Sequence, residues 1–220
     1  MMLNGKKIIV TGGASGIGRA TVLLAADEGA DVAIADIDGA AAEETAGLVR
    51  AAGREALVIE MDTSKAADAQ RMADETVAAF GTIDGVVCCA IKQKPAKLEE
   101  LTEEEWDMVI DIGLKGYFLC AQAAGRVMLA KGSGAIVFVS SVGGVQAYNG
   151  AGAYSIAKAG NVMLGNLFGV EWGGRGVRAN TVLPGQVPTP LTQAMFDDPE
   201  IAAGRAAVVP MGRVGQPKEI

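Results

Sequence analysis

The sequence predicts an α/β fold built on a doubly wound parallel sheet, with a layer of helices on each face. Three observations predict it. Short apolar runs alternate with longer alanine-rich segments of helical period. The apolar runs are almost continuous, as is typical of strands that helices cover on both faces. A glycine-rich turn follows the first run. Because ligands of such folds bind beyond the carboxyl ends of the strands, we expect a site there.

Six strands are expected, and most of them are followed by a helix. In chain order, the strands are 7–11, 31–35, 56–61, 85–89, 135–140 and 177–182. The helices are 16–28, 39–52, 65–80, a helical region from Thr102, and 153–172. Thr102 and Glu105 have the spacing of a capping box, and Gly29, Gly53 and Gly81 follow helices where a left-handed residue is favoured. We expect residues 186–204 to cross one sheet edge as a long loop, and residues 1–220 to form one domain.

The composition excludes several classes of function. The 220 residues carry a net charge of -7, which argues against nucleic acid and anionic membranes as partners. No apolar stretch reaches the ~18 residues that span a bilayer, and the N-terminus lacks the features of a signal peptide. We therefore expect a cytoplasmic protein whose three cysteines are reduced.

The chain contains no histidine. A serine–histidine–aspartate triad and a histidine-bound catalytic zinc are therefore excluded, and no metal site is predicted. Acid–base chemistry near neutral pH must fall to tyrosine, lysine, cysteine or a carboxylate.

The glycine-rich turn joins the first strand to the first helix. Gly12, Gly16 and Gly18 let its backbone approach a pyrophosphate at the positive end of the helix dipole. The alternative is a turn that binds no ligand. Asp36 ends the second strand, where a carboxylate accepts hydrogen bonds from an adenosine ribose and repels a 2′-phosphate. Because Ile37 and not arginine follows, the sequence favours NAD over NADP; the alternative is a solvated turn aspartate.

Other polar residues lie at the ends of later strands. Asp62 follows the third strand, where it is expected to bind a nucleotide, to cap the next helix, or to do both. Ser140 and Ser141 close the fifth strand, just before the helix that carries Tyr154 and Lys158. A serine hydroxyl and the phenol would then converge on one substrate carbonyl oxygen.

Tyr154 and Lys158 stand at positions i and i+4 and share one helix face. A free phenol titrates near ~10, and a nearby ammonium with a cationic nicotinamide in a poorly solvated cleft would lower that pKa toward neutrality. On its own, such a pair is typical of an ordinary helix surface, so the neighbouring motifs must support the catalytic interpretation.

Taken together, these motifs resemble the short-chain dehydrogenase/reductase family, whose single domain has a Rossmann-like fold. The resemblance runs from Lys6 to the last residue. It is carried by the order and spacing of Thr11, Gly12, Gly16, Ile17, Gly18, Asp62, Ser141, Tyr154, Lys158, Asn180, Pro184, Gly185 and Thr189.

The resemblance implies a role for each motif. Tyr154 would be the catalytic acid–base, Lys158 would hold the nicotinamide ribose and lower the pKa of the phenol, and Ser141 would orient the substrate oxygen. Asp36 would bind the adenosine ribose and Asp62 the adenine region. The residues implied to bind NAD are Gly12, Ser15, Gly16, Ile17, Gly18, Asp36, Asp62, Thr63, Ala90, Tyr154, Lys158, Pro184, Gly185, Val187 and Thr189. The family also implies a homo-oligomer, a dimer or tetramer, formed through the helices on either side of the fifth strand.

Three features depart from the family pattern. Residues 88–91 read Cys-Cys-Ala-Ile where the family has Asn-Asn-Ala-Gly, so we expect a displaced loop on the nicotinamide side. Gly113 stands where the family has a catalytic asparagine, whose main-chain carbonyl helps to hold a water. The family pattern also continues for roughly thirty residues beyond Ile220, with a last helix and a seventh strand.

We therefore expect an NAD-dependent oxidoreductase that interconverts a small secondary alcohol and a ketone, with Leu191, Met195 and Phe196 forming an apolar lid. Two alternatives remain. In the first, the changes at residues 88–91 and 113 leave a non-catalytic dinucleotide-binding protein. In the second, the chain is a sugar-nucleotide epimerase or dehydratase, which by resemblance would normally need a larger C-terminal substrate region.

Overall fold

The computed structural model describes residues 1–220, apart from the side chain of residue 194. Within this range, six parallel strands form one sheet in the order β3-β2-β1-β4-β5-β6. The strands are β1 Lys7–Thr11, β2 Asp31–Asp36, β3 Ala56–Glu60, β4 Gly85–Cys88, β5 Gly134–Val139 and β6 Val177–Val182. The α-helices are α1 Gly16–Asp27, α2 Gly39–Ala51, α3 Ala66–Phe80, α4 Glu103–Ile110, α5 Gly116–Lys131, α6 Tyr154–Trp172 and α7 Pro199–Ala207.

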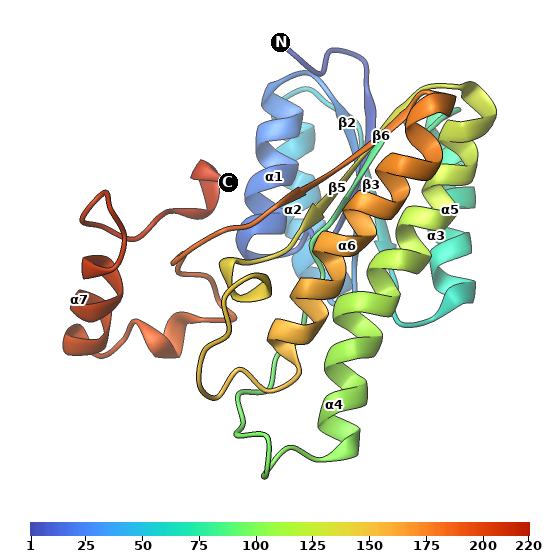
Figure 1. Ribbon diagram of the computed structural model, residues 1–220. Coiled ribbons are helices and arrows are strands. Elements are labelled where there is room, and N and C mark those ends of the chain that lie inside the picture. Colours follow the sequence, from blue (N-terminus) through green and yellow to red (C-terminus); the bar gives the residue numbers. More distant parts are fainter.

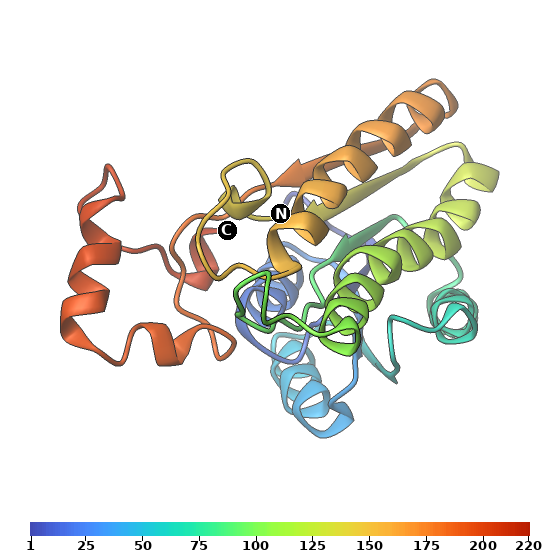
Figure 2. The ribbon, with the colours of Figure 1, turned by 60° about the horizontal axis from the view of Figure 1, so that its bottom comes forward.

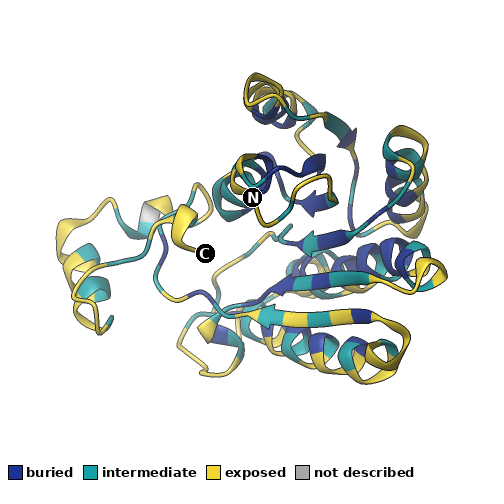
Figure 3. Ribbon diagram, turned by 90° about the horizontal axis from the view of Figure 1, so that it is seen from above, coloured by how far each residue is buried: buried dark blue, intermediate teal, exposed yellow. Residues whose placement is uncertain are grey.

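Helices cover the two faces of the sheet, as Figures 1 and 2 show. α1 and α2 pack on one face, over a core that includes Val10 and Ile34. α3, α5 and α6 pack on the other, over a core that includes Ile9, Met72 and Phe138. Both sides of the central strands are therefore buried, and Figure 3 shows the buried residues gathered in the sheet and on the inner helix surfaces. This explains why the strand sequences are almost continuously apolar.

The predicted elements agree closely with the structure. β1 and β6 have the predicted bounds, and the other strand ends differ by a single residue. Thr102 and Glu105 form the predicted capping box at the start of α4. Gly29, Gly53 and Gly81 all adopt positive φ after their helices. These details could be predicted because each depends on a short stretch of chain.

The prediction of a loop at 186–204 is wrong in part, because α7 begins inside it. Asp198 caps this helix by accepting hydrogen bonds from the backbone of Glu200 and Ile201, and Pro199 occupies the first helical position. α7 lies apart from the sheet in Figures 1 and 2, and none of its described residues is buried.

Residues Asp111–Lys115 form a π-helix between α4 and α5, which the sequence did not predict. Such insertions widen one helical turn and are frequent at functional sites. This one places Ile112 beside the carboxyl ends of the strands.

Over the described residues, no helix combines the length and the apolar character needed to cross a membrane.

Candidate active site

A cavity of about 460 Å³ lies beyond the carboxyl ends of the strands. This volume is in the range of cofactor and small-molecule sites. All the predicted catalytic and NAD-binding residues line it: Gly12, Ser15, Gly16, Ile17, Gly18, Asp36, Asp62, Thr63, Ala90, Ser141, Tyr154, Lys158, Pro184, Gly185, Val187 and Thr189. The parallel topology brings these distant segments to one edge of the sheet.

The glycine turn forms the wall of the cavity at the start of α1. Gly12 has a φ of 69°, and a Cβ atom built on Gly18 would lie 2.0 Å from the carbonyl oxygen of Gly12. Only glycine fits at position 18, and the turn is consequently tight. None of the described residues in the first turn of α1 is acidic, so the free amides and the helix dipole there favour an anion. The turn therefore fits the pyrophosphate of a dinucleotide.

The carboxylate of Asp36 is fixed at the mouth of the cavity. One of its oxygens accepts a hydrogen bond from the Ala14 backbone at 2.9 Å, and the other accepts one from Asp38 at 3.1 Å. The side chain of Ile37 is 71% exposed beside it and also lines the cavity. A negative, anchored group with no neighbouring guanidinium suits two ribose hydroxyls better than a 2′-phosphate.

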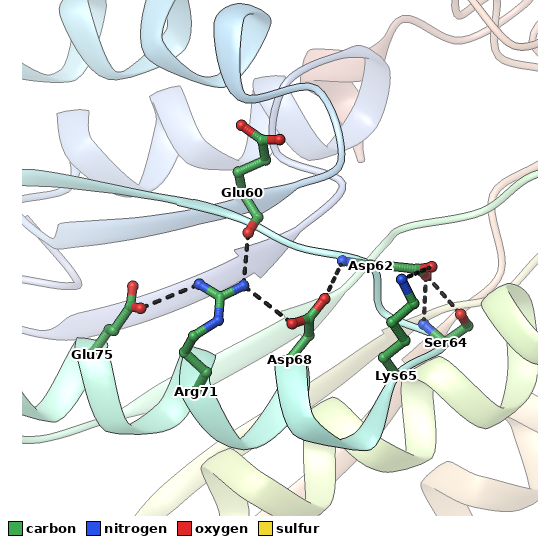
Figure 4. Close-up of polar contacts among 7 residues, drawn as sticks. All are labelled: Glu60, Asp62, Ser64, Lys65, Asp68, Arg71 and Glu75. Carbon is green, nitrogen blue, oxygen red and sulfur yellow. Dashed lines mark hydrogen bonds and ion pairs between the residues drawn. The ribbon is translucent and has the colours of Figure 1, made fainter.

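Asp62 does not cap α3, which removes the capping alternative. The N-cap of α3 is Lys65, whereas the Asp62 carboxylate accepts hydrogen bonds from the backbone and hydroxyl of Ser64, at 3.0 and 2.7 Å (Figure 4). The Ser64 hydroxyl is the main cause of a lowered pKa for Asp62. Asp62 therefore presents an ordered, ionised carboxylate at the cavity wall.

The start of α3 is tied back to β3 by a second set of contacts (Figure 4). The Asp62 backbone N–H donates to the Asp68 carboxylate at 2.9 Å, and this bond is the main cause of the lowered pKa of Asp68. Arg71 bonds to Asp68, to Glu75 and to the main-chain carbonyl of Glu60. This network fixes the position of the turn that carries Asp62.

The loop after β4 stays against the glycine turn despite its unusual sequence. The hydroxyl of Thr11 accepts hydrogen bonds from the backbone of Cys89 at 3.1 Å and of Ala90 at 3.4 Å. No described residue other than glycine has a positive φ, so Ile91 is accommodated without backbone strain. Burial raises the pKa of Cys89 to about 11, which keeps the thiol protonated near neutral pH and favours a packing role.

The changes at Ile91 and Gly113 fit together in space. A Cβ atom on Gly113 would lie 2.4 Å from the Cδ1 atom of Ile91, so the isoleucine side chain occupies the place that a larger residue 113 would need. The carbonyl of Gly113 is also engaged, because it accepts a hydrogen bond from the buried amide of Asn161 at 2.9 Å.

The two serines at the end of β5 make different hydrogen bonds. The Ser140 hydroxyl is buried and donates to the main-chain carbonyl of Lys158 at 2.7 Å, which joins β5 to α6. The Ser141 hydroxyl accepts a hydrogen bond from Gly143 and is a hydrogen-bonding neighbour of the Tyr154 phenol. Ser141 and Tyr154 therefore face the same region of the cavity, as the sequence predicts.

Lys158 is 2% exposed, and its ammonium group donates two hydrogen bonds within the protein. It donates to the Tyr117 hydroxyl at 3.0 Å and to the Val139 carbonyl at 2.7 Å. Burial lowers the pKa of Lys158 to about 8. The ammonium also lies 5.7 Å from the centre of the Tyr154 ring.

The expected lowering of the Tyr154 pKa is not seen in this structure. Burial raises the pKa of this phenol, and the hydrogen bond with Ser141 offsets only part of the increase. The Lys158 ammonium donates to Tyr117 and Val139 and makes no hydrogen bond to the Tyr154 phenol. The phenol is therefore protonated at neutral pH and can serve as a proton donor.

The segment after β6 closes the remaining side of the cavity. The hydroxyl of Thr192 accepts a hydrogen bond from the Thr189 backbone at 3.0 Å and donates to the Val187 carbonyl at 3.1 Å. Leu191 lines the cavity, but Met195 and Phe196 do not, so only one of the three predicted lid residues is in place. The Arg205 guanidinium stacks 5.4 Å from the centre of the Phe196 ring, which directs Phe196 toward α7.

The sequence did not predict several groups that line the cavity or hydrogen-bond to its residues. They include Tyr117, the Val139 carbonyl, Cys89 as a wall residue, Ile112 in the π-helix, and Thr192. Of these, Tyr117 had the clearest signal, because a buried tyrosine hydroxyl usually has a hydrogen-bond partner.

Comparison with known proteins gives consistent matches over nearly the whole chain. A family model described as enoyl-(acyl carrier protein) reductase matches residues 12–220. Cis-4-hydroxycyclohexanecarboxylate dehydrogenase of Sinomonas cyclohexanicum is 40% identical over 213 residues, which cover 96% of this chain and 84% of that protein.

Two solved structures are also similar. A short-chain type dehydrogenase/reductase from Mycobacterium marinum has a TM-score of 0.93 at 31% identity, and the match covers 99% of this chain and 85% of the other. A structure described as NAD+-bound xylitol dehydrogenase has a TM-score of 0.94 at 27% identity, covering 100% of this chain and 90% of the other.

Proposed function

Because the chain belongs to the short-chain dehydrogenase/reductase family, we propose that it is an NAD-dependent oxidoreductase that interconverts a secondary alcohol and a ketone. The observation that supports this most is the meeting of a dinucleotide-type glycine turn with Ser141, Tyr154 and Lys158 in one cavity. We further propose that residues 1–220 act as one cofactor-binding and catalytic domain.

In this proposal, a bound nicotinamide cofactor would supply the hydride chemistry, and the glycine turn, Asp36 and Lys158 would hold it. Tyr154 gives its phenolic proton to the substrate oxygen in the reductive direction and removes the proton in the oxidative direction. Ser141 donates a hydrogen bond to the same oxygen and so fixes the substrate near the phenol. Lys158 holds a ribose hydroxyl with its ammonium group.

The protonation of Tyr154 gives the reaction a direction-dependent pH profile. Because burial raises the pKa of this phenol, the proton-donating form dominates at neutral pH. Ketone reduction is therefore favoured at neutral pH, and alcohol oxidation should accelerate as the pH rises toward about 8, where Lys158 begins to lose its proton.

The preference for NAD is proposed from Asp36. A 2′-phosphate at the same place would lie against its anchored carboxylate, with an unfavourable charge interaction. The NAD-bound state of a similar solved structure supports a nicotinamide dinucleotide as the cofactor class.

Two measurements test the proposal. Titration with NAD and with NADP gives the two affinities, and the absorbance of the reduced nicotinamide follows turnover of a panel of cyclic, acyclic and polyhydroxy secondary alcohols. We expect the wild type to prefer NAD by at least about tenfold, the effect of roughly 1.4 kcal/mol. Asp36→Ala should bind NADP about as well as NAD. The matched control is Asp38→Ala, since Asp38 caps α2 and does not line the cavity. Equal NAD and NADP affinity in the wild type would contradict the cofactor assignment.

The same assay distinguishes the proposed enzyme from the non-catalytic alternative. NAD binding without turnover of any secondary alcohol, in either direction, would favour a dinucleotide-binding protein.

We also propose that the chain self-associates through α6. Met163, Leu167 and Val170 are 56%, 49% and 83% exposed on this helix, which is much apolar surface for a lone molecule. A solution mass of one 22.4 kDa chain at micromolar concentration would contradict this.

A further inference from the structure

The ammonium of Lys158 is held by a pocket of neutral groups. Its two acceptors are the Tyr117 hydroxyl on α5 and the Val139 carbonyl at the end of β5. The titratable groups that face it are Tyr117, Tyr154 from α6, and Cys88 and Cys89 at the end of β4. Burial raises the pKa of both cysteines, so none of these neighbours is charged near neutral pH. The ammonium therefore depends on hydrogen bonds and not on a counter-ion.

The orientation of the Tyr117 hydroxyl is determined by its other bond. Its proton is donated to the Val139 carbonyl at 3.1 Å, which leaves an oxygen lone pair to accept from Lys158. A carbonyl oxygen can accept two hydrogen bonds, and Val139 does so here. The three groups thus form a closed triangle of hydrogen bonds.

The ring that carries this hydroxyl is fixed in place. Tyr117 is 1% exposed and stacks on Phe138, with ring centres 6.2 Å apart and planes at 16°. The ammonium lies 4.9 Å from the centre of the Tyr117 ring, where its charge also meets the negative ring face. Tyr117 is the second residue of α5, in the turn that follows the π-helix.

We propose that Tyr117 is a positioning residue for Lys158, whose ammonium it holds and keeps charged at the wall of the cavity. An ammonium has three N–H donors, and two are used by Tyr117 and Val139. The third remains for a ligand hydroxyl. The inference rests on the proposed function, in which Lys158 binds the ribose of the cofactor.

The direct test is the titration of Lys158 itself. The protein is labelled with ¹³C-lysine, the Cε signal of Lys158 is assigned with Lys158→Arg, and its shift is followed against pH in wild type and Tyr117→Phe. This substitution keeps the ring and removes one acceptor. We expect the Lys158 midpoint to fall by about one pH unit or more, as for loss of one hydrogen bond to a charged group. Tyr148→Phe is the matched control, because the hydrogen bonds of the Lys158 ammonium go to Tyr117 and Val139 and not to Tyr148, so the midpoint should stay unchanged.

Turnover supplies a second readout that a purely structural role would not give. If the midpoint falls from about 8 to about 7, the ratio of Tyr117→Phe to wild-type activity should drop from near one at pH 6 to about one tenth at pH 9. A loss of packing would lower this ratio equally at every pH.

An unchanged Lys158 midpoint in Tyr117→Phe would overturn the inference, whatever happens to activity. Because the titration needs neither cofactor nor turnover, its result is independent of the proposed function. Absence of NAD binding in the wild type would count against the proposed function instead.

Discussion

Lys158 is the residue at which function and stability are most directly opposed. It is almost fully buried, and burial lowers its pKa from 10.5 to about 8. Between these values, the unfolded chain binds the proton more tightly than the folded one. The free energy of unfolding contributed by this group therefore rises with pH from about 8 to 10.5. Below pH 8, the buried charge lowers stability by about 3 kcal/mol.

Replacement of Lys158 by methionine should accordingly stabilise the protein at pH 7, by about 2 kcal/mol after the loss of its two hydrogen bonds. Denaturant unfolding at pH 7 and at pH 10 measures this, and the gain should be smaller at pH 10. Lys115→Met is the control, since Lys115 is exposed and pairs only with Asp111 on the surface. A Lys158→Met variant that is less stable than the wild type at pH 7 would contradict the cost assigned to the charge.

The site residues that the sequence predicted are those that residue identity and spacing are enough to identify. Asp36, Ser141, Tyr154 and Lys158 each follow a strand or share a helix face, so the topology alone brings them to the cavity. The hydrogen bonds of Tyr117 depend on contacts between α5, β5 and α6, which no local pattern contains. The turn at Asp62 was ambiguous because an aspartate before a helix serves as a cap or as a turn residue equally well.

Among the elements, the π-helix and the loop after β4 are linked through Ile91 and Gly113. The Cδ1 atom of Ile91 fills the space beside Gly113, and its next nearest atom, Cγ1, lies 3.9 Å from a Cβ built there. The two departures from the family pattern are thus one packing arrangement. Both residues also adjoin the cavity, since Ile91 and Ile112 line it.

A double-mutant cycle tests this link. Gly113→Ala should lower the free energy of unfolding by about 1 kcal/mol and push Ile91 toward the cavity, which weakens NAD binding. Ile91→Val removes only the Cδ1 methyl group, so Gly113→Ala should be harmless in that background. Gly47→Ala is the control, because Gly47 lies in α2 with nothing within 4 Å of an added Cβ. Additive effects of the two substitutions would contradict direct packing.

The bounds of most elements followed from the sequence because hydrophobic period and helix caps are local properties. The π-helix could not be predicted, since its extra residue is accommodated through contacts of Gly113 with Ile91 and Asn161. The sequence did not predict α7 because Ile201 is its single large apolar side chain, although Asp198 and Pro199 are typical of a helix start.

Across the whole molecule, the sheet order explains how the site assembles. β1 and β4 are neighbours at the centre, so the glycine turn after β1 meets the loop after β4, and the ends of β5 and β6 complete the cavity. The sequence predicted a doubly wound parallel sheet, and right-handed crossovers restrict the strand orders that such a sheet can adopt. The pairing of the strands does not determine the position of α7, which lies apart from the sheet in Figure 1.

The central claim is that Tyr154 transfers the proton in a nicotinamide-dependent reaction. The most direct measurement compares kcat and the NAD dissociation constant of wild type, Tyr154→Phe and the control Tyr148→Phe, with a substrate from the alcohol panel. The account predicts that Tyr154→Phe lowers kcat by about 10²–10⁴-fold, the usual size of general acid–base catalysis, while NAD binds within about twofold of wild type. Wild-type kcat in Tyr154→Phe would contradict the account.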